Sequence, residues 1–263
     1  MQIETVTTDS FAMKYFKFGT GKKTAVILPG ISVKSVTNSA YSISSLYKAL
    51  KQDYTVYVFD RRETCPEDYT IEGMAEDTAI AFDVLGLSRV YLFGLSQGGM
   101  IAQCIAINRP DLVCKLALCS TIPRVTESNS RVLEKWISLA EVGDEQALNR
   151  SIASSVFSDE LYSRFEGFIL QLMSGATEED IHRFLILAKG CRGFDVTDKL
   201  HKIKCPVRVV ATKADKVFDF EETVLIPKLI KAELYVYENY GHTVCDEAPD
   251  FQQRLLEFFG KSL

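Results

Sequence analysis

Short apolar runs alternate along the chain with longer segments in which apolar residues recur every three or four positions. The longer segments, such as residues 71–85 and 250–259, predict amphipathic helices. The runs have the length of strands and no polar face, as expected in a parallel sheet that is covered on both sides. They occupy residues 54–59, 89–93, 116–119, 207–211 and 234–237. This alternation predicts an α/β fold with a mostly parallel central sheet and helices on both faces.

The segments that precede this alternation predict a β-hairpin. Residues 13–18 alternate weakly between apolar and polar, and Gly19-Thr20-Gly21 after them is typical of a turn. Residues 24–28 form an apolar run that ends at Pro29-Gly30. We therefore expect these two strands to pair with each other.

A block of three to four predicted helices interrupts the strands between residues 123 and 189. Gly143 can end one of these helices, and Ser158 can begin another. Thr177, with an aspartate three residues later, resembles the capping box of a further helix. The block follows a strand, so it begins at the edge of the sheet where the strands end.

The expected organisation is one α/β core with an inserted helical cap. The core comprises residues 1–121 and 196–263, and the cap comprises residues 122–195, before the last two strands. Ligands of such sheets bind beyond the carboxyl ends of the strands. We therefore expect the cap to lie over the site as a lid.

The segment Gly94-Leu95-Ser96-Gln97-Gly98 contains a candidate nucleophile. A serine hydroxyl is a weak nucleophile at neutral pH and needs a base within hydrogen-bond reach. The motif alone has low specificity, but here it stands between an apolar strand and a helical pattern. That setting is typical of a sharp turn that exposes a serine, and small residues around Ser96 allow strand and helix to approach closely. The alternative is an idle serine in a glycine-rich turn.

His242 is the candidate base among the three histidines of the chain. His182 falls inside a predicted cap helix and His201 in a lysine-rich stretch, so we expect both to be solvated. His242 follows the last predicted strand and a short loop, at the same edge of the sheet as Ser96. A base needs such a position to reach the nucleophile.

Asp215 is the candidate for the acid that orients the base, because it follows the strand that precedes the last one. Asp219 lies nearby and stays open as an alternative. Asp246 and Glu247 are closer to His242 in sequence, but we expect them to begin the last helix.

Composition and charge mainly exclude classes of partner and of cellular location. The 263 residues carry a formal net charge of −5 with acidic and basic residues interspersed, so a nucleic acid is not an expected partner. No apolar run reaches the roughly 18 residues that a membrane helix needs, and residues 1–10 do not resemble a signal peptide. The seven cysteines form no CxxC pair, which favours a reducing cytoplasm over a disulfide framework.

Together these features resemble the α/β-hydrolase superfamily, in its capped branch of esterases, lactonases, cofactor-free haloperoxidases and carbon–carbon-bond hydrolases. The order Ser96, Asp215, His242 is that of the family, and the helical block stands where the family has its cap. The resemblance spans nearly the whole chain apart from the cap. The motifs that carry it are Leu28-Pro29-Gly30, Phe59-Asp60-Arg61, Gly94-Leu95-Ser96-Gln97-Gly98-Gly99, Asp215, Gly241-His242 and Glu247-Ala248-Pro249.

The resemblance implies that the backbone N–H groups of Ile31 and Gln97 form an oxyanion hole. Gln97 begins a helix, where unpaired amides and the helix dipole favour an anion. Pro29-Gly30 stands where the family usually has His-Gly, but the expected donor is the residue after the glycine. We expect Asp60 to be structural and to pair locally with Arg61 or with loop amides.

The sequence thus predicts a serine hydrolase that cleaves a carboxylic ester, thioester or lactone of a small to medium-sized molecule through an acyl-enzyme on Ser96. His242 takes the serine proton and later activates water, Asp215 holds the imidazole, and neither a metal nor an organic cofactor is needed. Two alternatives stay open, because a fold does not determine the chemistry. The same residues could serve a carbon–carbon-bond hydrolase or a lyase, or the chain could be a ligand-binding receptor without turnover.

Overall fold

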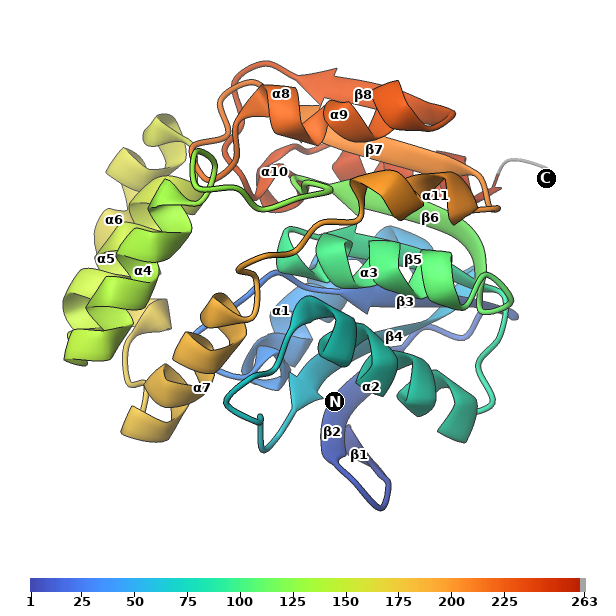
Figure 1. The fold of residues 1–263 in the computed structure, drawn as a ribbon, viewed down its shortest axis with the longest axis horizontal. Coiled ribbons are helices and arrows are strands. Elements are labelled where there is room, and N and C mark those ends of the chain that lie inside the picture. Colours follow the sequence, from blue (N-terminus) through green and yellow to red (C-terminus); the bar gives the residue numbers. More distant parts are fainter. Residues whose placement is uncertain (261–263) are drawn as a thin grey trace.

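Eight strands form one mixed sheet (Figure 1). They are β1 (Ile3–Thr7), β2 (Ala12–Phe18), β3 (Lys23–Leu28), β4 (Tyr54–Arg62), β5 (Val90–Leu95), β6 (Val113–Cys119), β7 (Val207–Thr212) and β8 (Ala232–Tyr237). Their order in the sheet is β1-β2-β4-β3-β5-β6-β7-β8, and the strands from β3 to β8 run parallel. The computed structural model describes residues 1–260, so the last three residues of the predicted core segment lie outside the described residues. The predicted α/β fold with a mostly parallel sheet is confirmed.

The predicted hairpin between residues 13–18 and 24–28 is wrong. β2 pairs antiparallel with β1 on one side and with β4 on the other, whereas β3 lies between β4 and β5. The physical reason is burial: the last four residues of β3 are all buried, and a central position with two parallel neighbours provides that cover. β1 was not predicted, because only Val6 of its five residues is buried, as is usual for an edge strand.

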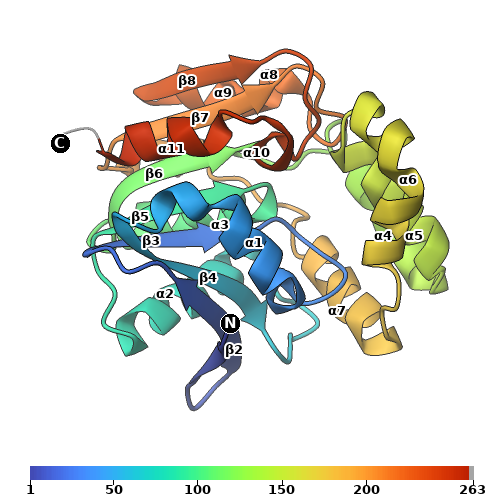
Figure 2. The same ribbon diagram turned by 180° about the vertical axis from the view of Figure 1, so that it is seen from behind.

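Helices cover both faces of the sheet (Figures 1 and 2). α2 (Ile71–Val84) and α3 (Gln97–Asn108) lie on one face, and α1 (Ala40–Leu46) and α11 (Phe251–Gly260) lie on the other. Two apolar cores result, one on each face. The remaining helices of the core are the short α8 (Phe220–Thr223), α9 (Leu225–Leu229) and α10 (Val244–Glu247). None of the helices within residues 1–260 is long and apolar enough to cross a membrane.

Four α-helices, followed by a short 3-10 helix at Thr197–Lys202, lie between β6 and β7, and we call the four α-helices the helical insertion. They are α4 (Arg131–Val142), α5 (Glu145–Val156), α6 (Asp159–Met173) and α7 (Glu178–Lys189). They stand beyond the end of the sheet toward which the parallel strands point (Figure 2). Their ends follow the predicted signals: Gly143 has a left-handed backbone after α4, the Ser158 side chain caps α6, and Thr177 with Asp180 forms a capping box before α7.

Replacing Phe82 by Ala tests the packing of α2 on the sheet. The Phe82 side chain is fully buried, and its ring centroid lies 5.3 Å from that of Phe59 in β4. We expect a loss of about 3–5 kcal/mol in the free energy of unfolding, measured by urea denaturation. The control is Val84→Ala in the same helix, where the side chain is 56% exposed and the expected change is within about 0.5 kcal/mol. Equal effects of the two variants would contradict this packing.

Candidate active site

Ser96 occupies a strained turn between β5 and α3. Its backbone has φ +53° and ψ −122°, a conformation that non-glycine residues adopt only where the surrounding structure imposes it. Here the neighbouring strand β6 and the loop after it hold both backbone groups of Ser96. The N–H of Ser96 donates to the Cys119 carbonyl at 3.0 Å, and the Ser96 carbonyl accepts from the Thr121 hydroxyl at 2.7 Å. These two hydrogen bonds help to hold Ser96 in its strained backbone conformation.

Three glycines allow this turn because strand and helix nearly touch there. A β-carbon at Gly94 would lie 2.6 Å from the Gly98 carbonyl oxygen, and one at Gly99 would lie 2.6 Å from Thr121 Cβ. A β-carbon at Gly98 would collide with the Leu28 carbonyl group. The small residues around Ser96 therefore have the role that the sequence predicted for them.

Asp215 and His242 form a buried hydrogen-bonded pair. His242 Nδ1 lies 2.8 Å from Asp215 Oδ2 and 3.0 Å from Oδ1, and the two side chains are 3% and 2% exposed. Asp215 Oδ1 also accepts the backbone N–H groups of Val217 and Phe218 at 2.8 and 3.1 Å. A carboxylate only accepts hydrogen bonds, so Nδ1 carries the imidazole proton and Nε2 keeps its lone pair.

The other acidic candidates lie elsewhere. Asp219 is exposed, precedes α8, and makes no hydrogen bond with His242 within the described chain. Asp246 and Glu247 do not begin the last helix as we expected, because they belong to the separate helix α10 and α11 starts only at Phe251. The other two histidines, His182 and His201, are exposed as predicted.

Ser96, Asp215 and His242 follow β5, β7 and β8, so they share one edge of the sheet. The structure brings Asp215 and His242 into contact. Over residues 1–260 it forms no hydrogen bond between Ser96 and His242. In enzymes without a bound substrate such bonds are often long and tighten only in the reacting complex.

The loop that leads to Ile31 and the start of α3 at Gln97 both lie next to Ser96. A β-carbon at Gly30, which precedes Ile31, would lie 3.3 Å from Ser96 Cβ, so this loop runs directly beside the serine. Gln97 is the first residue of α3, where a backbone N–H has no partner within the helix. Neither amide donates to a protein acceptor in the described part of the chain. Both are therefore available to an anion next to Ser96.

The buried guanidinium of Arg61 joins these two segments. Its Nη2 donates to the Pro29 carbonyl at 2.8 Å, and its Nη2 and Nε donate to Gln97 Oε1 at 3.1 and 3.3 Å. Arg61 is 4% exposed, and burial lowers its pKa, while the carboxylate of Asp60 offsets part of that shift. Gln97 Nε2 in turn donates to the Leu187 carbonyl of α7 at 2.8 Å. One side chain thus connects the loop before Ile31, the residue after Ser96 and the helical insertion.

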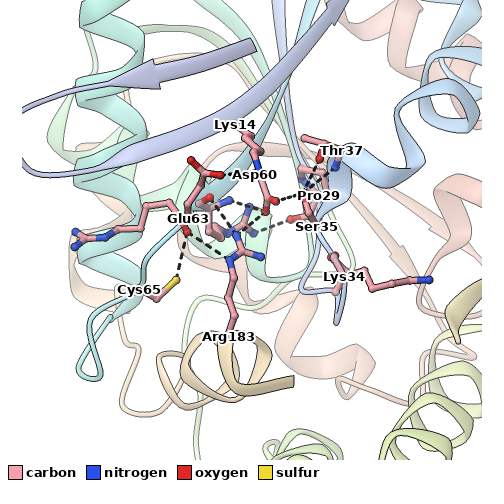
Figure 3. Close-up of polar contacts among 12 residues, drawn as sticks. Lys14, Pro29, Lys34, Ser35, Thr37, Asp60, Glu63, Cys65 and Arg183 are labelled. Carbon is pink, nitrogen blue, oxygen red and sulfur yellow. Dashed lines mark hydrogen bonds and ion pairs between the residues drawn. The ribbon is translucent and has the colours of Figure 1, made fainter. Parts of the chain in front are cut away.

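Asp60 pairs locally with Arg61, as predicted, and has two further partners that were not foreseen. Its carboxylate accepts from Arg61 N–H at 2.7 Å, from Ser35 Oγ at 2.6 Å and from Arg183 Nη2 at 2.9 Å. Figure 3 shows Arg183 rising from α7 toward Asp60. Burial acts to lower the pKa of Arg183, but Asp60 and Cys65 outweigh it, and this pKa lies above its usual value. No sequence motif marks Arg183, because its partner is 123 positions away in the chain.

Arg61→Lys tests whether the forked guanidinium, rather than the charge alone, holds this edge together. A lysine keeps the charge but has no Nε–H, so the second hydrogen bond to Gln97 Oε1 is lost, and its flexible ammonium lacks the fixed planar geometry of the guanidinium. We expect a loss of about 1–3 kcal/mol in the free energy of unfolding, measured by urea denaturation. The control is Arg131→Lys at the exposed start of α4, which should change it by less than about 0.5 kcal/mol. Unchanged stability in Arg61→Lys would show that the bridge is dispensable.

Known proteins share the fold and part of the sequence of this chain. The family model described as alpha/beta hydrolase fold matches residues 26–249. A relative from Agrobacterium fabrum, provisionally named a carbamate hydrolase, is 25% identical over 238 residues, which cover 84% of this chain and 88% of that protein. The 3-oxoadipate enol-lactonase 1 of Acinetobacter baylyi is 20% identical over 222 residues, which cover 82% of each protein.

The crystal structure of an enol-lactonase from Burkholderia xenovorans has a similar fold. It superposes with a TM-score of 0.84 and covers 98% of this chain and 100% of its own. Its sequence identity to this chain is 18%, so this likeness concerns the fold.

Proposed function

The chain belongs to the α/β-hydrolase fold family and is a hydrolase, and we propose that it cleaves a carboxylic ester, thioester or lactone of a small to medium-sized molecule through an acyl-enzyme on Ser96. The observation that carries the proposal is the strained Ser96 turn, which lies beside the loop that leads to Ile31 and directly before the first residue of α3, Gln97. The buried His242–Asp215 pair at the same edge of the sheet supplies the base and its orienting acid.

The reaction follows from these positions. Ser96 Oγ attacks the substrate carbonyl carbon while His242 Nε2 takes the serine proton, and the N–H groups of Ile31 and Gln97 stabilise the resulting oxyanion. The intermediate collapses, and the imidazolium of His242 protonates the leaving alcohol or thiol. Water then attacks the acyl-enzyme with His242 as the base, which releases the acid and restores Ser96. Asp215 holds the ring and stabilises its charged form.

The names of the relatives support an acyl group bonded to a heteroatom as the target. A lactone is a cyclic ester, and a carbamate has its carbonyl between oxygen and nitrogen. One relative is named an enol-lactonase and another is provisionally named a carbamate hydrolase. We propose further that the helical insertion acts as the cap over this site and that the enzyme works in a reducing compartment, in keeping with its seven free cysteines.

Ser96→Ala tests the nucleophile. We expect kcat on short-chain p-nitrophenyl esters and on a panel of lactones to fall by about 10⁴-fold or more, because no other group can form the acyl-enzyme. An organophosphonate should label the unaltered protein at Ser96 and leave the variant unlabelled, as read by mass spectrometry. Ser88→Ala, an exposed serine just before β5, serves as the control.

Retained ester turnover in purified Ser96→Ala would refute the assignment. Labelling of Ser96 without turnover of any ester, thioester or lactone would instead favour carbon–carbon-bond hydrolysis or a lyase reaction. The absence of both labelling and turnover would favour a ligand-binding receptor.

Asp215→Asn and Asp219→Asn together test which of the two aspartates orients His242. In Asp215→Asn the amide no longer fixes the tautomer with the proton on Nδ1, and we expect kcat to fall by about 10⁴-fold. Asp219→Asn, four positions away and exposed, should leave kcat within about twofold, because Asp219 forms no hydrogen bond or ion pair with His242 in the described chain. The reverse ranking in steady-state kinetics would reassign the acid to Asp219.

A further inference from the structure

The carboxylate of Glu247 joins the loop of His242 to the helical insertion. Glu247 ends α10, and its Oε1 accepts the N–H of Gly241 at 3.2 Å and the N–H of Ser158 at 3.1 Å. Its Oε2 accepts the Ser158 hydroxyl at 2.5 Å. Ser158 Oγ also accepts the Leu161 N–H and so caps α6. One side chain therefore connects the residue before the base with the first turn of an insertion helix.

A second set of contacts lies on the other side of His242. The N–H and the hydroxyl of Thr243 both donate to the Val156 carbonyl, at 2.9 and 3.1 Å. A β-carbon at Gly241 would lie 2.5 Å from Phe157 C and from Ser158 N, so the two backbones are in direct contact there. The residues on both sides of His242 are thus fixed to the junction of α5 and α6, at residues 156–158.

Two carboxylates hold the proposed base, His242, in different ways. Asp215 bonds the imidazole ring and sets its tautomer and orientation. The backbone from which the ring projects is held by Glu247 and by the Val156 carbonyl. Glu247 forms no hydrogen bond with the ring or with Ser96 in the described chain, so its effect on the reaction would pass through the position of His242.

We propose that Glu247 is a positioning residue that holds the His242 loop against the helical insertion and keeps Nε2 aligned with Ser96. This inference rests on the proposed function, because it concerns the base of that reaction. Its consequence is that a contact on the insertion side, at Ser158, influences the chemical step although Ser158 contacts none of Ser96, Asp215 and His242 through a hydrogen bond in the described chain.

The test compares Glu247→Ala, Glu247→Gln, Ser158→Ala and the double variant Glu247→Ala/Ser158→Ala. We expect Glu247→Ala to lower kcat and the rate of phosphonate labelling of Ser96 by up to about 100-fold, with KM within about threefold, because small misplacements of a catalytic group have effects of this size. Glu247→Gln should recover most of the rate, since its amide oxygen can accept the same two N–H groups. Ser158→Ala should have a smaller effect, and the double variant should be no worse than Glu247→Ala alone, because both act through one link.

The matched control is Glu257→Ala, an exposed glutamate on α11. All rates are measured below the thermal unfolding midpoint of each variant. Rates in Glu247→Ala equal to those of the unaltered protein would overturn the inference. The inference would also be overturned if Glu247→Gln failed to recover the lost rate and the effects of Glu247→Ala and Ser158→Ala were additive in the double variant.

Hydrogen exchange separates failure of this inference from failure of the proposed function. The amides of Gly241 and Ser158 should exchange faster in Glu247→Ala and remain protected in Glu247→Gln, whether or not any substrate is turned over. An unaltered protein that is neither labelled at Ser96 nor active on any ester would refute the proposed function. Unchanged exchange in Glu247→Ala would refute the link itself.

Discussion

The arrangement of this edge of the sheet depends on the buried guanidinium of Arg61. Two segments that are distant in sequence, the loop from Pro29 and the start of α3 at Gln97, must stand a fixed distance apart if their N–H groups are to meet one oxyanion. Neither segment bonds the other through its backbone in the described residues. Arg61 Nη2 donates to both the Pro29 carbonyl and Gln97 Oε1, and its Nε adds a second bond to Gln97 Oε1, so one rigid planar group links the two segments.

The same cluster has an electrostatic consequence. The guanidinium of Arg61 is buried and the Arg183 side chain is 16% exposed; Asp60 forms an ion pair with Arg183, and its charge also acts on the pKa of Arg61. Asp60 alone does not neutralise two guanidinium groups, so an excess of positive charge remains close to the residue after Ser96. In a site where Ser96 is only 7% exposed, water screens this field weakly. In the proposed reaction, this field and the two backbone N–H groups would act in the same direction on a developing oxyanion.

The sequence predicts the parts of this molecule whose signals are local. Consecutive apolar residues revealed the central strands, and the glycines around Ser96 revealed the turn, because each pattern reflects the burial or the close packing of its own segment. The edge strand β1 left no such pattern, since one of its faces is solvated. The apolar run of β3 was visible, but sheet order is a non-local property, and so the hairpin was wrong. For the same reason the partners of Asp60 and the role of Arg183 became visible only in three dimensions.

The helical insertion forms hydrogen bonds both near the proposed oxyanion donors and with the loop of the proposed base, His242. Near the proposed oxyanion donors, the Leu187 carbonyl of α7 accepts a hydrogen bond from the side-chain amide of Gln97, and Arg183 of α7 donates to Asp60. On the side of the base, the junction of α5 and α6 holds the His242 loop through Glu247. An insertion attached in this way would support the proposed site structurally as well as act as its proposed cap. Changes in its sequence that alter the substrate pocket therefore also act on the nucleophile turn and on the base, which limits how far the pocket can vary without loss of catalysis.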